Sequence, residues 1–345
     1  MRAVTIRAHG GPEVVRLQDL PEPRPGPGDV VLEVRAAAIN HLDIWVRNGR
    51  PGMALRFPHV LGSDAAGVVA ETGPGVVDLG PGQEVLLNPA LWCGRCEWCL
   101  RGEQSECPDF TLLGLGRPGT FAERVAAPAS CVHPKPAHLD FAQAAALPLA
   151  HVTAWRMLLA RGALGPGETV LIHGIGGGVA LAALRFAKAF GARVFVTSSS
   201  DEKLARARSL GADHALNYRA EPDVAKWVRG ETAGRGVDLV LDTVGAATWA
   251  ADFAAVRRGG RIVLCGVTTG PRAETPLNVL YWNQVSVLGS TMGAAEDFRR
   301  MLRWVGETRF EPVLDSVRPL AEAPAALRQM EAGAQFGKIV LQVGG

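Results

Sequence analysis

Short apolar stretches of strand length alternate with helical stretches from residue 168 onward, and this alternation constrains the fold most. The strand-like runs are ETVLIHG, ARVFVTS, VDLVLDTVG, RIVLCGV and VSVLGSTM. Between them lie helical runs, including DEKLARARSLGA, with a capping box predicted at Ser199 and Glu202, and ATWAADFAAVRRGG. Strands that alternate with helices at this spacing favour a parallel, doubly wound α/β sheet.

The first 130 residues have a different pattern, because Pro and Gly interrupt them frequently. Short β-like runs such as VVLEV and EVLLN lie between these turn residues. This half is predicted to be an irregular, mainly antiparallel β domain. The last run of the chain, FGKIVLQV, is suited to rejoin it as a final strand.

Composition excludes several classes of partner. The 345 residues carry a net charge of +2 without a basic block, which argues against nucleic acid. The longest apolar stretch, near AQAAALPLAHVTAWRMLLA, contains His151 and Arg156 and is too polar to span a membrane. The first residues hold no apolar run that would serve as a signal peptide. We therefore expect a cytoplasmic protein, in which thiols stay reduced.

A glycine-rich segment follows the first strand of the alternating half. Gly174, Gly176, Gly177 and Gly178 stand between that strand and a helix. Glycines permit a tight turn and close approach to a pyrophosphate, whose charge a helix N-terminus favours. Such glycines can also serve only to pack a helix on a strand. The strand before, the helix after and the alternating pattern together favour a dinucleotide site.

The end of the second predicted strand bears on the choice of cofactor. An NAD site usually has an acidic residue about twenty positions after the glycines. This chain has TSSSDEK there, with Ser198 at the strand tip. Small hydroxyls leave room for a 2′-phosphate, and Lys203 supplies a positive charge, although the serines also suit a helix cap. We predict NADP(H) in preference to NAD(H).

Four of the six cysteines lie within fifteen residues, at Cys93, Cys96, Cys99 and Cys107. Four thiolates make a closed tetrahedral site, which suits a structural zinc and leaves no position for a substrate. An iron–sulfur cluster is the alternative metal centre, since short C-x2-C runs also bind it. Free thiols at this density in a reducing compartment are the less favoured interpretation.

Taken together, these segments resemble the medium-chain dehydrogenase/reductase superfamily over essentially the whole chain. GDVVLEVRAAAINHLDIWVRNG, VLGSDAAGVVAETGPGV, the cysteine segment, LPLAHVTAW, the glycine loop and FGKIVLQV follow the family's order. The resemblance implies a GroES-like, mainly-β catalytic domain from residues 1–134 and 290–345, which carries one structural zinc. It implies a Rossmann dinucleotide-binding domain from residues 135–289. We also expect a homodimer or homotetramer.

The resemblance fails at the catalytic zinc. Relatives that use one have Cys, His and Cys where this chain has Asn40, Ser63 and Leu149, while Asp64 matches the acid beside the family's His. Asn and Ser are poor zinc ligands, and Leu is none. The run INHLDIWVRNG resembles instead the quinone-oxidoreductase branch, which has no catalytic zinc but usually lacks the cysteines. That branch has a Tyr where this chain has Trp45.

The resemblance also implies roles for further residues at the cofactor. Thr153 and Val179 would flank the nicotinamide, and His41 would lie near the pyrophosphate. The remaining implied cofactor contacts are Gly174, Gly177, Gly178, Ser198, Ser199, Lys203, Tyr218, Cys265, Gly266, Val267 and Lys338.

The leading functional hypothesis is an NADPH-dependent reductase of quinones or activated C=C bonds, such as enones and enoyl thioesters. Asn40, Asp43 and His59 are its predicted catalytic residues, with the Asn40 amide as a donor and His59 or water returning the proton. One alternative is an alcohol dehydrogenase with a relocated zinc site built from His41, His59 and His151, with Asp43 or Asp64 as a further ligand; His59 and His151 also suit hydrogen-bonded positions in the wall of the cleft. The other is a non-catalytic NADPH-binding sensor. The sequence does not name the substrate.

Overall fold

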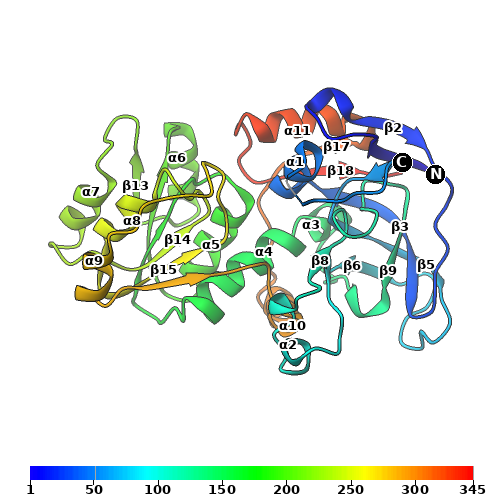
Figure 1. Cartoon of the computed structure of the whole chain (residues 1–345), viewed down its shortest axis with the longest axis horizontal. Coiled ribbons are helices and arrows are strands. Elements are labelled where there is room, and N and C mark those ends of the chain that lie inside the picture. Colours follow the sequence, from blue (N-terminus) through cyan, green and yellow to red (C-terminus); the bar gives the residue numbers. More distant parts are fainter. Residues whose placement is uncertain (51, 345) are drawn as a thin grey trace. The chain divides into compact units, whose positions relative to one another are not determined.

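The computed structural model describes residues 1–50 and 52–344, which form two compact units (Figure 1). Unit 1 comprises Met1–Ala150 and Ala294–Gly345, and unit 2 comprises His151–Gly293. The division falls after Ala150 and not after residue 134, because helix α3 (Phe141–Ala145) packs on strands of unit 1. Among the described residues, no helix combines the length and the apolar character that membrane crossing requires.

Unit 1 is built on a seven-stranded sheet in the order β10-β6-β5-β3-β18-β17, with β9 also paired to β3. Between the described strands of this unit, every ladder is antiparallel except β17–β18. The final strand β18 pairs with β3, so the tail rejoins the first domain as predicted. The strands are β1 (Arg2–Ile6), β2 (Arg16–Asp19), β3 (Asp29–Ala38), β4 (His59–Val60), β5 (Asp64–Thr72), β6 (Glu84–Leu87), β7 (Ala90–Leu91), β8 (Thr111–Leu112), β9 (Arg124–Pro128), β10 (Val132–Pro134), β17 (Leu314–Pro319) and β18 (Lys338–Gln342).

The helices of unit 1 lie at its loops and in the tail. They are α1 (His41–Asn48), α2 (Glu97–Leu100), α3, α10 (Ala295–Thr308) and α11 (Ala323–Glu331). The turn into β5 depends on Gly62, whose φ is +98°. A Cβ there would lie 2.3 Å from a ring carbon of Phe121. Because only glycine fits this close approach, the turn delivers Ser63 and Asp64 to a buried position at the start of β5.

Unit 2 contains a six-stranded sheet in the order β13-β12-β11-β14-β15-β16, and all its described ladders are parallel. Counted from β11, this is the order 3-2-1-4-5-6 of a Rossmann fold, so the predicted fold class is confirmed. The strands are β11 (Thr169–Ile172), β12 (Arg193–Ser198), β13 (His214–Asn217), β14 (Val237–Asp242), β15 (Val256–Leu264) and β16 (Ser286–Gly289). The helices are α5 (Gly178–Ala189), α6 (Asp201–Ser209), α7 (Val224–Glu231), α8 (Trp249–Ala255) and α9 (Leu277–Trp282); α4 (Pro148–Trp155) precedes them and continues as a π-helix over Arg156–Arg161.

Two local predictions in unit 2 are wrong. The N-cap of α6 is Ser200, whose hydroxyl accepts the Lys203 N–H at 3.3 Å, so the predicted capping box at Ser199 and Glu202 lies one residue too early. The run VRRGG does not continue α8, because β15 begins at Val256. The β-branched Val256 and the glycines Gly259 and Gly260 disfavour a helix here. The segment pairs instead with β14, with a shift in register.

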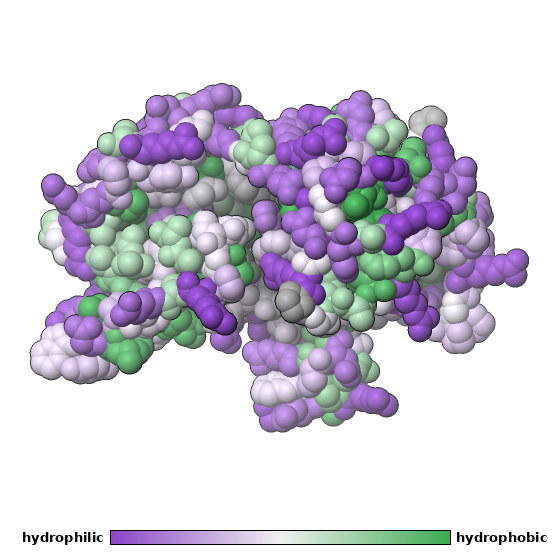
Figure 2. Space-filling model, turned by 45° about the horizontal axis from the view of Figure 1, so that its top comes forward, coloured by the Kyte–Doolittle hydropathy of each residue, from purple (hydrophilic) through white to green (hydrophobic). Residues whose placement is uncertain are grey.

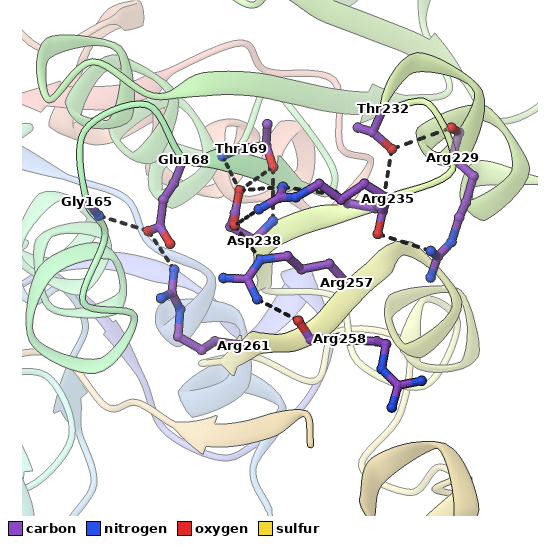
Figure 3. Close-up of polar contacts among 11 residues, drawn as sticks. Gly165, Glu168, Thr169, Arg229, Thr232, Arg235, Asp238, Arg257, Arg258 and Arg261 are labelled. Carbon is purple, nitrogen blue, oxygen red and sulfur yellow. Dashed lines mark hydrogen bonds and ion pairs between the residues drawn. The ribbon is translucent and has the colours of Figure 1, made fainter. Parts of the chain in front are cut away.

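A charged cluster joins the amino ends of β11, β14 and β15 (Figure 3). Asp238 accepts hydrogen bonds from Arg235, Arg257 and the backbone and hydroxyl of Thr169. Burial opposes ionisation of Asp238, but these donors outweigh it and hold the pKa of the carboxyl well below its usual range. Nearby, Arg261 donates to Glu168 at 2.6 Å. Ion pairs and hydrogen bonds therefore hold the amino ends of these strands together, at the end of the sheet opposite to their carboxyl ends.

Candidate functional site

A buried network of three polar side chains lies where α1, β5 and β18 begin. Asn40 is the N-cap residue of α1, Asp64 opens β5 and Lys338 opens β18, and each is at most 5% exposed. The Lys338 ammonium donates to the Ile39 carbonyl oxygen at 2.9 Å, to Asn40 Oδ1 at 2.6 Å and to Asp64 Oδ2 at 3.0 Å. All three of its N–H bonds are therefore used inside unit 1.

Asn40, Ser63 and Leu149, which replace the zinc ligands of metal-using relatives, lie in or next to this network. Asn40 Nδ2 donates to Asp64 Oδ2 at 2.9 Å and to the Ala38 carbonyl oxygen at 3.3 Å, and the Leu149 N–H donates to Asp64 Oδ1 at 2.9 Å. The Ser63 hydroxyl donates to the Leu113 carbonyl oxygen at 2.8 Å. An amide used at both ends, a bonded hydroxyl and a hydrocarbon side chain do not fit a zinc ion.

The predicted catalytic residue Asp43 serves the same region through backbone contacts. Its Oδ2 accepts the Asn40 N–H at 2.8 Å, and its Oδ1 accepts the Gly62 N–H at 3.2 Å. Burial raises the pKa of Asp43 to about 7, against the opposing hydrogen bond from Asn40 and the charge of Lys338. The carboxyl thus ties the start of α1 to the turn before β5.

His59, in β4, is buried beside the loop that contains Gly114. Its Nε2 lies 2.9 Å from the Gly114 carbonyl oxygen. A carbonyl only accepts, so Nε2 carries the proton and Nδ1 has the free lone pair. Burial lowers the pKa of His59 and favours this neutral form. The structure brings Asn40 and Asp43 together and places His59 on a separate strand; the catalytic roles of all three stay predictions.

The glycine-rich loop is where the sequence places the dinucleotide. It connects β11 to α5, at the end of the strand pair β11 and β14 where the strand order reverses. Gly174 and Gly176 have φ values of +65° and +122°, which side chains disfavour. Gly177 is the N-cap residue and Gly178 and Val179 form the first turn of the twelve-residue helix α5. The arrangement fits a pyrophosphate at a helix N-terminus.

The carboxyl ends of β12 and β13 meet at the predicted ribose position. Ser198 ends β12, its Oγ accepts the Ser200 N–H at 3.2 Å, and its carbonyl oxygen accepts the Tyr218 N–H at 3.1 Å. Lys203 lies in the first turn of α6, and the Tyr218 side chain is 42% exposed. The structure therefore brings Ser198, Ser199, Lys203 and Tyr218 to one edge of the sheet, with a hydroxyl at the strand tip.

The other predicted cofactor residues lie in different places. Cys265, Gly266 and Val267 follow β15 at the same edge of the sheet, and the Cys265 N–H donates to the Asp242 carbonyl oxygen. Thr153 is buried in α4 and donates to the Met292 sulfur at 3.8 Å. In unit 1, His41 starts α1, and its ring meets Trp45 edge-on at 5.1 Å.

Sequence reasoning missed the role of Lys338, which it assigned only to the cofactor groove. The signal was present in VLGSDAAGVV, where Asp64 is a charged residue within an apolar run. A carboxylate in such a run is buried and needs a cationic partner. The partner lies 274 residues away in the chain, so no local pattern identified it.

The four clustered cysteines form the candidate metal centre. Their sulfur atoms all lie within 4.8 Å of one another, and the pairs Cys93–Cys99 and Cys93–Cys107 are 4.0 and 3.6 Å apart. Tetrahedral Zn–S bonds of about 2.3 Å require sulfur atoms about 3.8 Å apart, so the set fits zinc. Across the described residues, no other cluster of three His, Cys, Asp or Glu ligands is found, including one from His41 or His59 with Asp43 or Asp64.

Comparison with known proteins matches the chain over nearly its whole length. Residues 26–137 match the alcohol dehydrogenase GroES-like domain, and residues 178–307 match the zinc-binding dehydrogenase family. The zinc-type alcohol dehydrogenase-like protein YogA of Leptosphaeria maculans is 34% identical over 346 residues, which cover 95% of this chain and 94% of that protein.

Solved structures give the same picture. The crystal structure of an NAD-dependent alcohol dehydrogenase is 47% identical and covers 100% of both chains with a TM-score of 0.95. A crotonyl-CoA carboxylase/reductase, AntE, in complex with NADP is 26% identical, with 99% of this chain and 95% of that chain covered and a TM-score of 0.90.

Proposed function

The chain belongs to the medium-chain dehydrogenase/reductase superfamily of oxidoreductases, and from this membership we propose an NADPH-dependent reductase without a metal at the reaction centre. Its proposed substrates are quinones or activated C=C bonds, such as enones and enoyl thioesters. One observation carries the proposal. At the three positions where metal-using relatives have zinc ligands, the Asn40 amide is bonded to Asp64 and Lys338, the Ser63 hydroxyl is bonded to the Leu113 carbonyl oxygen, and Leu149 has a hydrocarbon side chain.

The charge of this network favours conjugated acceptors. Asp64 and Lys338 are a paired carboxylate and ammonium, so the network supplies no surplus positive charge for an isolated alkoxide. A reduced nicotinamide, when bound, supplies the hydride. In an enone or quinone, conjugation spreads the negative charge that develops, so ordinary hydrogen-bond donors are sufficient.

Within the proposal, the chain's own residues have limited tasks. Asn40 holds the ammonium and the carboxylate in place, since its amide is used at both ends. Asp43 fixes the backbone of Asn40 through its N–H. His59 is neutral and its Nε2–H donates a hydrogen bond to the Gly114 carbonyl oxygen, so in this scheme water supplies the proton that completes the reduced product.

NADPH as the preferred cofactor rests on the end of β12. Ser198 ends β12 where an acid would repel a 2′-phosphate, and Lys203 lies in the first turn of the following helix α6. Asp201 is near, but its Oδ1 accepts a hydrogen bond from Asn217 at 2.8 Å. The relative AntE was solved with NADP, whereas the NAD-dependent relative favours the other choice.

A second candidate is an alcohol dehydrogenase, which the names of the YogA and NAD-dependent relatives favour. Oxidation of a saturated alcohol requires that its hydroxyl proton be lost as hydride leaves. A zinc at a non-standard position would assist this step, so the two candidates differ in their response to chelation.

Steady-state turnover on matched substrates tests the proposal. After loosely bound metal is removed, we expect NADPH-dependent reduction of an enone or quinone, and weak or no oxidation of ethanol-like alcohols with NADP+. The experiment uses the wild-type chain. Faster turnover of the alcohol, together with zinc-dependent recovery after chelation, would establish the alcohol dehydrogenase instead.

The proposal includes one structural zinc on the four cysteines and a reducing, cytoplasmic location that keeps them as thiolates.

The proposal also includes assembly with a second copy of the chain. Strand β16 ends the six-stranded sheet, and Leu277, Tyr281, Trp282 and Val287 near it are 40–70% exposed. In Figure 2 the lower left end, where Figure 1 shows α9, is pale to green among hydrophilic neighbours. Pairing of two β16 edges would cover these side chains.

A further inference from the structure

A second buried network lies inside unit 2, and no step proposed above uses it. His173 follows β11 and directly precedes Gly174 of the glycine-rich loop. Its Nε2 is 2.8 Å from Asp252 Oδ1 in α8, and its Nδ1 is 3.2 Å from the Thr197 hydroxyl in β12. His173, Asp252 and Thr197 are each at most 2% exposed.

The other oxygen of Asp252 has no hydrogen-bond partner among the described residues. Burial raises the pKa of Asp252 to about 7 despite the opposing hydrogen bond from His173, and the charge of Asp242, the last residue of β14, adds to this rise. The Asp242 carboxylate accepts the Val244 N–H at 2.6 Å and the Thr248 hydroxyl at 3.0 Å. Asp242 therefore holds the residues that follow β14 and the N-cap residue of α8, the helix that carries Asp252.

The network joins the three segments that the sequence assigns to the cofactor. His173 precedes the glycine loop, and Thr197 precedes Ser198, while its carbonyl oxygen accepts the Ile175 N–H of the loop at 2.9 Å. Asp242 precedes the turn at residues 243–245, which packs closely on the segment 265–267: a Cβ at Gly266 would lie 2.6 Å from the Thr243 carbonyl oxygen. A shift of any member would therefore move a cofactor segment.

We propose that His173 and Asp252 are positioning residues for the dinucleotide, which with Asp242 hold the glycine loop, the end of β12 and the turn after β14 in their binding arrangement. The inference rests on the proposed use of a nicotinamide dinucleotide. In this arrangement His173 Nε2 donates to Asp252 Oδ1, His173 Nδ1 accepts from the Thr197 hydroxyl, and Asp242 holds the turn after β14 through the Val244 N–H and the Thr248 hydroxyl.

The same strand offers a matched control. Asp238 and Asp242 both lie on β14 and are buried, but Asp238 holds the amino ends of the strands (Figure 3), away from the cofactor edge. Asp238→Asn removes charged contacts and destabilises unit 2 without touching the cofactor segments. A role that is only structural predicts the same consequence for changes at Asp238 and Asp252.

The experiment is a fluorescence titration of the full chain with NADPH and with NADH, next to thermal unfolding. Asp252→Ala and His173→Ala should each raise the Kd for both cofactors by about tenfold. Asp252→Asn should restore most of the affinity, because its amide oxygen still accepts a hydrogen bond from His173 Nε2. Asp238→Asn should lower the Tm but change either Kd by less than about twofold.

Several outcomes overturn the inference. It is wrong if Asp252→Ala and His173→Ala bind both cofactors as tightly as the wild type, or if Asp238→Asn weakens binding equally. If Asp252→Ala does not fold, the Kd values of His173→Ala and Asp252→Asn are compared instead. Equal Kd values for these two variants would contradict a positioning role of the His173–Asp252 pair. A wild-type chain that binds neither dinucleotide refutes the cofactor proposal itself, which is a different result.

Discussion

At the scale of single residues, Asn40 is the position on which the proposed metal-free chemistry most depends. Its backbone begins α1, and its amide joins the Asp64 carboxylate to the Lys338 ammonium. Removal of a side chain that hydrogen-bonds two buried charged groups is costly. Each group then lacks a hydrogen-bond partner, and water does not reach the buried site to replace it. Asn40 is thereby a position where stability and the proposed chemistry depend on the same amide.

We therefore expect Asn40→Ala to lower the free energy of unfolding by about 2 kcal/mol. In the folded protein it should lower the turnover number more than it changes the affinity for NADPH. Thr120→Val is the control, because the Thr120 hydroxyl is also buried and bonds the Asp64 backbone oxygen at 2.9 Å. The control should lose stability and keep turnover. Equal effects of both changes on turnover would contradict a specific role for the amide.

Lys203 gives a second prediction at this scale. If its ammonium meets the 2′-phosphate, Lys203→Ala should weaken NADPH binding by about 1–3 kcal/mol, the value of a hydrogen bond to a charged group. NADH lacks the phosphate, so its affinity should stay the same. Binding titrations with both cofactors measure the ratio, and equal losses would show that Lys203 does not read the phosphate. A positioning variant such as His173→Ala should instead weaken both.

At the scale of elements, the cysteine segment is a short piece with little regular structure of its own. Its helix α2 has four residues, and its glycines Gly94 and Gly102 have positive φ values. A segment with so little regular structure buries too little apolar surface to be stable by packing alone. Metal binding can supply the missing folding free energy. Four thiolates within 4.8 Å of one another also repel strongly without a cation.

The prediction is one tightly bound zinc per chain. Cys96→Ser should lower zinc content and Tm, while turnover of the fraction that remains folded should change little. Elemental analysis and thermal unfolding measure the first two quantities. Cys131→Ser, at a buried cysteine outside the cluster, should keep the zinc. Two tightly bound zinc ions in the wild type would rule out the single-site interpretation.

The amino ends of β11, β14 and β15 give a prediction for pH. The pKa of Asp238 is lower in the folded chain than its ordinary value of 3.8, because donors from Arg235, Arg257 and Thr169 outweigh the cost of burial. A lowered pKa stabilises the fold above the unfolded pKa, and this contribution is lost as pH falls toward the folded pKa. Asp238→Asn should thus cost about 2 kcal/mol at pH 7 and progressively less below about pH 4.

Chemical unfolding of the wild type and Asp238→Asn across this pH range provides the measurement. Glu168→Gln serves for comparison, since Glu168 binds one arginine, Arg261, at the same edge and is more exposed than Asp238. Its cost should be smaller. A difference between wild type and Asp238→Asn that does not decline in acid would mean that the charge of Asp238 is not what stabilises the strands.

At the scale of the whole molecule, the exposed apolar side chains near β16 form the surface where we propose that two copies of the chain meet. Trp282 and Tyr281 are 68% and 70% exposed beside the free edge of β16. We expect a dimer or tetramer in sedimentation, and Trp282→Asp should shift it toward smaller species. Leu100→Asp, at another exposed apolar side chain on α2 in unit 1, should leave a dimer through β16 intact. A wild type that sediments as a monomer would refute this surface.

The sequence by itself determined the local and periodic features. Strand and helix alternation gave the parallel sheet, glycines gave the loop before α5, and close spacing gave the cysteine cluster, because each depends on neighbours within a few residues. Tertiary structure alone decided the rest. Lys338 reaches Asp64 across 274 residues, and His173 reaches Asp252 across 79. Burial makes such partners obligatory, but only the packed chain selects which residues meet, since many distant pairs have the same chemistry.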